Sequence, residues 1–167
     1  MGENLNIKKL SFVSFEINNG VYKAYLNISD FISIKNNQEI ILNNAVAIYN
    51  KYVDEMHNLI KDINNFRLKR SLIPAHYIWN IGDKIFKLKK DLENISLQID
   101  SLYKHLERDL NVKKSWLEKV IIFRRHIPFV NIIPVSLNWG KCSKRPGYIA
   151  NKLRNNYYNE KKIKYGY

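Results

Sequence analysis

Apolar residues recur every three or four positions along most of the chain after residue 36, and this period constrains the fold more than any other feature. Such a spacing places apolar side chains on one face of an α-helix. One stripe runs from Ile41 to Phe66 and a second from Ile78 to Leu92. The first predicts one long amphipathic helix, or two with a break near Asn43-Asn44. The chain is therefore predicted to be mainly α-helical.

Two shorter periodic stretches meet at Asn111-Val112. When Tyr103 is counted as the first residue of a bihelical unit, apolar residues fall at positions 4, 8, 10, 15 and 18, where two helices that cross over a short turn touch. These residues are Leu106, Leu110, Val112, Leu117 and Val120. Asn111 stands at position 9, which often needs a left-handed residue. Residues 102–125 are therefore predicted to form a helix-turn-helix-like unit within a bundle of helices.

One residue of this unit departs from the expected pattern. Glu107 occupies position 5, where DNA-binding helix-turn-helix units usually carry a small residue because the two helices approach closely there. An ordinary pair of core helices joined by a tight turn is therefore the alternative interpretation of the same residues.

The first 36 residues follow a different pattern. Residues 6–17 and 21–28 are rich in β-branched and aromatic residues, and Asn18-Asn19-Gly20 separates them. Asn-Gly readily adopts the positive φ angles of a tight turn, so residues 1–36 are predicted to contain a β-hairpin. Because an isolated hairpin is only marginally stable, we expect it to pair with a third strand, pack on the helices or dimerise, and so to serve as a scaffold or as an oligomer interface, for example of a homodimer.

The chain carries 28 Lys and Arg against 15 Asp and Glu, a net charge of +13. The excess is concentrated at one end: residues 111–167 have 13 basic and 2 acidic side chains, whereas residues 1–60 have 5 and 6. A small basic cluster, FRLKRS, also covers residues 66–71. Such a charge attracts polyanions, nucleic acid first and anionic membrane next. Because a general bias in composition would spread basic residues along the whole chain, the uneven distribution favours nucleic-acid binding as the explanation of the charge.

The helical part of the sequence divides near residue 142. Residues 37–142 are predicted to form a helical domain that contains the 102–125 unit, and residues 143–167 are predicted to form a basic, tyrosine-rich C-terminal tail with a short helix after Pro146-Gly147. Aromatic rings can stack on bases and lysines can neutralise phosphates, so this tail suits a nucleic acid. A truncated linker to a missing domain is an equally consistent interpretation.

The sequence lacks the long apolar run that a signal peptide or a membrane span needs. The longest run, residues 127–137, is interrupted by Pro128 and Pro134. A single cysteine, Cys142, cannot form an internal disulfide. We therefore expect a soluble cytoplasmic protein that does not bind a membrane.

Patterns typical of catalysis or metal binding are incomplete. Glu160-Lys161-Lys162 has the letters of the Glu-x-Lys of PD-(D/E)xK nucleases, but the nearest preceding Asp is Asp109, in a predicted helix. Cys142 has basic neighbours that would lower its pKa, yet no partner base is identifiable. The four histidines lack metal-ligand spacing; they are His57, His76, His105 and His126. We expect no catalysis, no metal and no cofactor.

Residues 70–142 resemble the helical N-terminal domain of the YhcG-like PD-(D/E)xK nucleases, a prokaryotic family. The resemblance rests on Trp79-Asn80-Ile81-Gly82, on the LERDL segment from Leu106 to Leu110, and on Leu137-Asn138-Trp139. It implies a helical domain that binds nucleic acid or a partner and is associated with nucleases of defence systems or mobile elements. In that family a nuclease domain normally follows, and here the chain stops.

These observations together favour a non-catalytic module that binds nucleic acid, with duplex DNA as its ligand. The helix from Lys113 to Arg125 is expected to approach the major groove. Nine polar side chains are predicted to contact bases or phosphates; they are Lys113, Lys114, Ser115, Lys119, Arg124, Arg125, Lys141, Lys144 and Arg145. Four apolar side chains of the same helix are predicted to be core; they are Trp116, Leu117, Val120 and Phe123.

Two other functions fit the same residues. The chain would be a protein-interaction module that docks on a nuclease or effector complex through the helix of residues 38–68, or it would bind RNA. The basic charge and the aromatic residues do not distinguish RNA from DNA.

Overall fold

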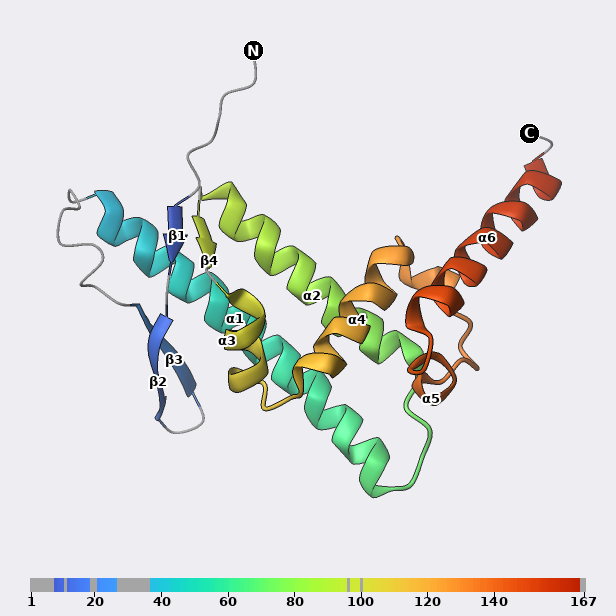
Figure 1. Ribbon diagram of the computed structural model, residues 1–167, viewed down its shortest axis with the longest axis horizontal. Coiled ribbons are helices and arrows are strands. Elements are labelled where there is room, and N and C mark those ends of the chain that lie inside the picture. Colours follow the sequence, from blue (N-terminus) through green and yellow to red (C-terminus); the bar gives the residue numbers. More distant parts are fainter. Residues whose placement is uncertain are drawn as a thin grey trace, which may run out of the picture. The chain divides into compact units, whose positions relative to one another are not determined.

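The computed structural model describes residues 8–10, 12–18, 21–26, 37–95, 97–99 and 101–165. Backbone contacts divide the chain into two compact units. Unit 1 consists of Met1–His57 and Ile85–Asn111, and unit 2 of Asn58–Lys84 and Val112–Tyr167. Each unit therefore combines two segments that are separated in the sequence. Figure 1 labels the helices and strands along the chain.

The described chain is mainly α-helical, as the apolar period predicts. The main helices are α1 (Asn37–Leu68), α2 (Ala75–Asn94), α3 (Leu102–Asp109), α4 (Lys114–His126), α5 (Trp139–Cys142) and α6 (Pro146–Tyr165), with a 3-10 helix η2 (Val130–Ile132) between α4 and α5. Of the two interpretations of the first stripe, the single helix is correct, because α1 runs through Asn43-Asn44 without a break. The proposed tail from residue 143 is largely helical, since α6 covers twenty of its residues.

The predicted hairpin is present as two antiparallel strands. Strand β2 (Phe12–Asn18) pairs with β3 (Val21–Leu26), from Phe12 opposite Leu26 to Asn18 opposite Val21. The turn residues Asn19 and Gly20 lie outside the described residues. A second pairing has no signal in the sequence pattern: β1 (Lys8–Leu10) lies parallel to β4 (Leu97–Ile99), which follows α2. A role for the hairpin as scaffold or dimer interface stays a prediction.

Unit 1 contains buried apolar residues of α1, such as Val53, and of α2, such as Ile85 and Leu88, together with polar groups that hold the helices in place. The hydroxyl of Tyr49 in α1 donates a short hydrogen bond to the buried carboxylate of Asp109, at the end of α3. Asp109 also accepts a 2.7 Å hydrogen bond from Arg108 Nε, and Tyr52 donates to Asp91 at 2.6 Å. Burial, reinforced by the charge of Asp109, raises the pKa of Tyr49 above its ordinary value, so this phenol stays protonated as a donor.

In unit 2, the close approach of α2 and α4 depends on a glycine. A Cβ atom added to Gly82 would lie 2.6 Å from Cβ of Arg124 and 3.2 Å from the carbonyl oxygen of Val120. Any larger residue would therefore push α4 away from α2. This contact explains why a glycine, which destabilises a helix interior by about 1 kcal/mol relative to alanine, is found there.

The turn between α1 and α2 is closed by a Schellman motif. The backbone N–H of Ser71 donates to Phe66 O at 2.8 Å, and that of Arg70 donates to Arg67 O at 3.0 Å. The motif needs a left-handed residue, and Arg70 occupies that position with φ of 52°. Arginine is strained in this conformation, whereas glycine would not be.

The chain that follows this turn pairs with the segment that leads into α5. The N–H of Trp139 donates to Ile73 O at 2.8 Å, and the N–H of Ala75 donates to Leu137 O at 2.9 Å. Pro74 and Asn138 form the antiparallel bridge between these bonds. The proline-punctuated segment after α4 buries Ile132 and Ile133 at its short 3-10 helix but exposes Val135, and the bridge ties the chain before α5 to the beginning of α2.

Candidate nucleic-acid interface

Helix α4 has one buried face and one polar face, and both follow from the spacing of its residues. The buried residues are Leu117, Val120, Ile121 and Phe123. The exposed residues are Lys114, Ser115, Glu118, Lys119, Ile122 and Arg125. The prediction of a core face is confirmed for Leu117, Val120 and Phe123, whereas Trp116 is half-buried. The ring of Phe123 meets that of Trp139 edge to face, with centroids 5.5 Å apart.

Eight of the nine predicted contact residues are exposed to solvent. They are Lys113, Lys114, Ser115, Lys119 and Arg125 in or next to α4, and Lys141, Lys144 and Arg145 in and after α5. Among them, Lys114 Nζ lies 3.8 Å from Glu118 Oε1, in a pair whose two side chains are both more than half exposed. Water screens such a pair, so Lys114 can exchange Glu118 for a phosphate at little cost.

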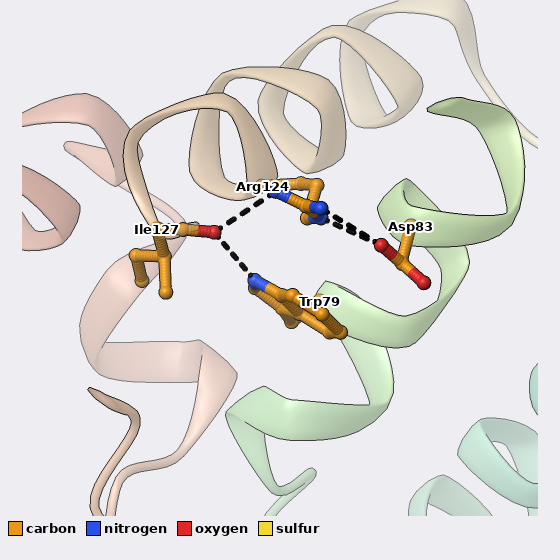
Figure 2. A network of polar contacts seen from close by, with 4 residues as sticks. All are labelled: Trp79, Asp83, Arg124 and Ile127. Atoms are coloured by element: carbon orange, nitrogen blue, oxygen red, sulfur yellow. Dashed lines mark hydrogen bonds and ion pairs between the residues drawn. The ribbon is translucent and has the colours of Figure 1, made fainter. Parts of the chain in front are cut away.

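Arg124 is the exception, because its guanidinium is held inside unit 2 (Figure 2). Its Nε and Nη2 donate to Asp83 Oδ1 at 3.0 and 2.8 Å, and its Nη1 donates to Ile127 O at 3.1 Å. The guanidinium carbon lies 4.5 Å from the ring centroid of Trp79, whose indole N–H donates to the same carbonyl at 2.9 Å. The prediction that Arg124 neutralises phosphate is therefore corrected: its charge is already matched by Asp83.

The spacing within α4 contains the signal for this correction. Arg124 follows the buried Val120 by four residues and Leu117 by seven, so it lies on the core face. Arg125, by contrast, follows Ile122 by three residues, and both are on the exposed face. The two arginines are therefore neighbours in the sequence but lie on different faces of α4. The acidic partner of Arg124, 41 residues earlier in the chain, has no such local signal.

The segment after α4 presents cations on a short, capped helix. The side chain of Asn138 accepts a 3.2 Å hydrogen bond from the backbone N–H of Lys141 and so caps α5. Cys142, the last residue of α5, is fully buried, and its Sγ lies 3.4 Å from Asn138 O. Burial raises the pKa of the Cys142 thiol to about 11. The expectation that basic neighbours lower this pKa is thus wrong, because the neighbouring lysines point into solvent while the thiol does not.

We expect Cys142 to react slowly with thiol reagents in the folded protein. With a pKa of about 11, roughly one thiol in a thousand is ionised at pH 8. The rate of labelling by a disulfide reagent at pH 8 measures this, with the urea-unfolded protein as the control. We expect labelling at least 100-fold slower in the folded state, and equal rates would contradict the buried position of Cys142.

Helix α6 packs on α4 through its first turns and is exposed beyond them. Gly147 lies against Ile122 and His126 of α4, and Ala150 is fully buried. From residue 155 to residue 163 every residue except the half-buried Tyr157 is exposed. Tyr157 and Tyr158 meet edge to face, and Lys161 Nζ lies 4.9 Å from the ring centroid of Tyr157. Basic and aromatic side chains therefore share this solvent-exposed part of α6.

The two units differ sharply in charge. Unit 1 carries 10 Lys and Arg against 11 Asp and Glu, whereas unit 2 carries 18 against 4, a net charge of +14. The segment 58–84 contributes five of these cations, including Arg67, Lys69 and Arg70, which the sequence pattern separates from the basic C-terminal third. The basic cluster FRLKRS was visible in the sequence, but its membership of the same unit as α4 was not.

The turn of the predicted helix-turn-helix-like unit has the expected backbone conformation. Asn111 is left-handed, with φ of 50°, as its place in the pattern predicts. Leu106 and Leu110 are buried as well. Helix α3 belongs to unit 1 and α4 to unit 2. The insertion of α4 into a DNA groove stays a prediction.

Within the part of the chain that the structure describes, no cluster of three or more His, Cys, Asp or Glu side chains is arranged to hold a metal ion. None of the described helices combines the length and the apolar character needed to cross a membrane.

Comparison with known proteins adds no relative: neither the family models, nor the curated proteins, nor the solved structures contain a match to this chain. The resemblance of residues 70–142 to the YhcG-like domain stays a prediction.

Proposed function

We propose that unit 2 binds nucleic acid, with duplex DNA as the preferred form, and that the exposed face of α4 is the central contact surface. The observation that carries this proposal is the charge of unit 2, +14, beside a unit 1 that is nearly neutral. A field of this strength concentrated on one compact unit attracts a polyanion and orients it toward that unit.

The arrangement of side chains on α4 suits phosphate. Lys113 precedes the helix, and its first turn contains Lys114 and Ser115 but no acidic residue. The N-terminus of a helix carries partial positive charge and backbone N–H donors, which favour an anion. Lys119 and Arg125 continue the exposed face along the helix. A phosphate backbone laid along this face would meet a cation at each turn of α4.

The segments after α4 add further exposed cations and aromatic rings to unit 2. Lys141, Lys144 and Arg145 are exposed in and after α5, and α6 packs on α4. Two exposed rings of α6, Tyr148 and Tyr158, offer stacking surfaces for unpaired bases. A duplex would use mainly the cations, whereas single-stranded DNA or RNA would also use the tyrosines.

A docking role for α1 is less well supported. The apolar stripe that would form the docking face contains Tyr49, Val53 and Met56, each with no exposed surface. These side chains are occupied by the packing of the protein itself. We therefore do not propose α1 as a partner-binding helix.

Binding measurements with three nucleic acids test the proposal. Fluorescence anisotropy with a duplex DNA, its single strand and an RNA of the same sequence, at 50 and 200 mM salt, gives both affinity and salt dependence. If six or more phosphates are contacted, raising the salt concentration from 50 to 200 mM should weaken duplex binding by about 1000-fold. Affinity that does not depend on salt would contradict the proposal, and a preference for RNA would replace DNA as the ligand.

A further inference from the structure

The turn between α1 and α2 combines exposed leucines with exposed cations. All of the residues from Arg67 to Leu72 are exposed. Two of them are leucines, with 82% of Leu68 and 73% of Leu72 accessible to solvent. The others include three cations and no acid. The cations of this turn suit an anionic partner, and the two exposed leucines suit an apolar site on the same partner.

This turn is also fixed in shape. The Schellman motif closes it with two backbone hydrogen bonds, and Phe66 packs edge to face on Tyr77 of α2 with ring centroids 5.3 Å apart. Arg70 supplies the left-handed residue in spite of its strain. Glycine would adopt this conformation without strain, and arginine instead places a cation at the left-handed position of the turn.

The turn connects directly to the basic segment around α5. The bridge between Pro74 and Asn138 joins the chain that leaves Leu72 to the chain that enters α5. Lys141 and Lys144 follow within a few residues. Two basic segments of unit 2, about seventy positions apart in the sequence, are therefore joined by one isolated β-bridge.

We propose that the α1–α2 turn is a second contact for the duplex bound by unit 2, and that its leucines act as a wedge between bases. Arg67, Lys69 and Arg70 would bind the phosphates on either side of a groove, while Leu68 or Leu72 enters a base step that is already loosened. Apolar wedges flanked by cations are used in this way by proteins that bend DNA through its minor groove. The ligand class is thus a duplex that is flexible or distorted, such as one with a bulge. This inference rests on the proposed function.

An anionic bilayer is the other partner that cations and exposed leucines would suit. The bridge to the basic α5 segment favours the duplex, because it holds the cations of the turn and those of the α5 segment together within the strongly basic unit 2. Co-sedimentation of the protein with vesicles that contain an anionic lipid separates the two. Vesicle binding that is lost with the leucines, without a change in duplex binding, would overturn the proposal.

The leucines are tested with a pair of duplexes, one perfectly paired and one with a two-nucleotide bulge. We expect wild-type protein to bind the bulged duplex about tenfold more tightly. The double variant Leu68→Ser/Leu72→Ser should lose this preference and keep its salt dependence, because no charge is removed. Val135→Ser is the matched control: Val135 is 89% exposed, and no charged residue lies within five positions of it.

The cations are tested with Arg67→Ala/Lys69→Ala/Arg70→Gly. Glycine adopts the left-handed conformation of residue 70 without strain, so the turn keeps its shape and the variant remains folded. Losing three phosphate contacts lowers the slope of log affinity against log salt by about 3. The wedge would be overturned, and the proposed function left intact, by two results together. The cation variant would have the same salt slope as wild-type protein, and the leucine variant would keep the preference for the bulged duplex. No salt-dependent duplex binding by wild-type protein would overturn both.

Discussion

Alanine in place of Lys113, Lys114 and Lys119 lowers the affinity for duplex DNA by about 100-fold near 0.1 M salt, if unit 2 binds as we propose. Each phosphate contact releases close to one counterion, and at this salt concentration each release strengthens binding by several-fold. The three lysines are exposed, and the pair that Lys114 forms with Glu118 is screened by solvent. Anisotropy titrations at several salt concentrations should therefore show a slope reduced by about 3.

A variant with the same change in net charge is the control for this experiment. Lys51, Lys61 and Lys104 are equally exposed but lie outside α4, α5 and α6. Their replacement with alanine changes the long-range field by the same amount without removing a contact, so we expect a loss of only a few-fold. Similar losses in the two triple variants would mean that net charge alone attracts the DNA, and that α4 is not the contact surface.

The second large effect that we expect concerns stability: Asp83→Ala should lower the free energy of unfolding by about 3 kcal/mol. Asp83 and Arg124 are 12% and 18% exposed at their side chains, and the nitrogen and oxygen are 2.8 Å apart. Removing the carboxylate leaves a guanidinium largely buried without its counterion, which costs more than the loss of an exposed pair. Urea denaturation followed by far-UV circular dichroism measures the change.

Two further variants identify the cause of that loss. Glu118→Ala removes the exposed partner of Lys114 and should change stability by less than about 0.5 kcal/mol. Asp83→Ala/Arg124→Met should be more stable than Asp83→Ala alone, because the uncompensated charge is gone. A double variant that is less stable than the single one would show that Arg124 contributes mainly through its stacking on Trp79 and its hydrogen bond to Ile127.

The two classes of variant also separate folding from binding. The α4 lysines are exposed, so their loss should leave the unfolding transition unchanged. Arg124 lies next to Arg125 in the sequence, but its replacement should affect folding, because its guanidinium is paired with Asp83 within unit 2. Arg125→Ala is therefore expected to weaken DNA binding, whereas Arg124→Ala is expected to destabilise the protein first.

Local spacing predicts most of the helical structure of this chain. The stripe from Ile78 to Leu92 is buried as its period requires, and Leu117, Val120 and Phe123 form the core face of α4. Asn111 is left-handed as its place between two apolar stretches indicates. These features follow from residues within a turn or two of one another, because one helix face is set by neighbours three and four positions apart.

Local spacing fails where the partner is distant. The parallel pairing of β1 with β4 joins residues about ninety positions apart, and no periodicity marks it. The acceptor for Arg124 lies in α2, and the space for that side chain exists because residue 82 is a glycine. Gly82 could be recognised in the sequence as a site of close packing, but not as the neighbour of Arg124.

The sequence by itself determined the helices, their buried faces and the excess of basic residues toward the C-terminus, because each of these depends on composition or on neighbours within a few positions. Only the tertiary structure decided which cations belong together. It joins the segment 58–84 to the segment 112–167, and so unit 2 gains the α1–α2 turn and a net charge of +14. The physical reason is that helices associate through the fit of buried surfaces, as at Gly82 and Arg124, and the charges on their exposed faces are brought together as a consequence.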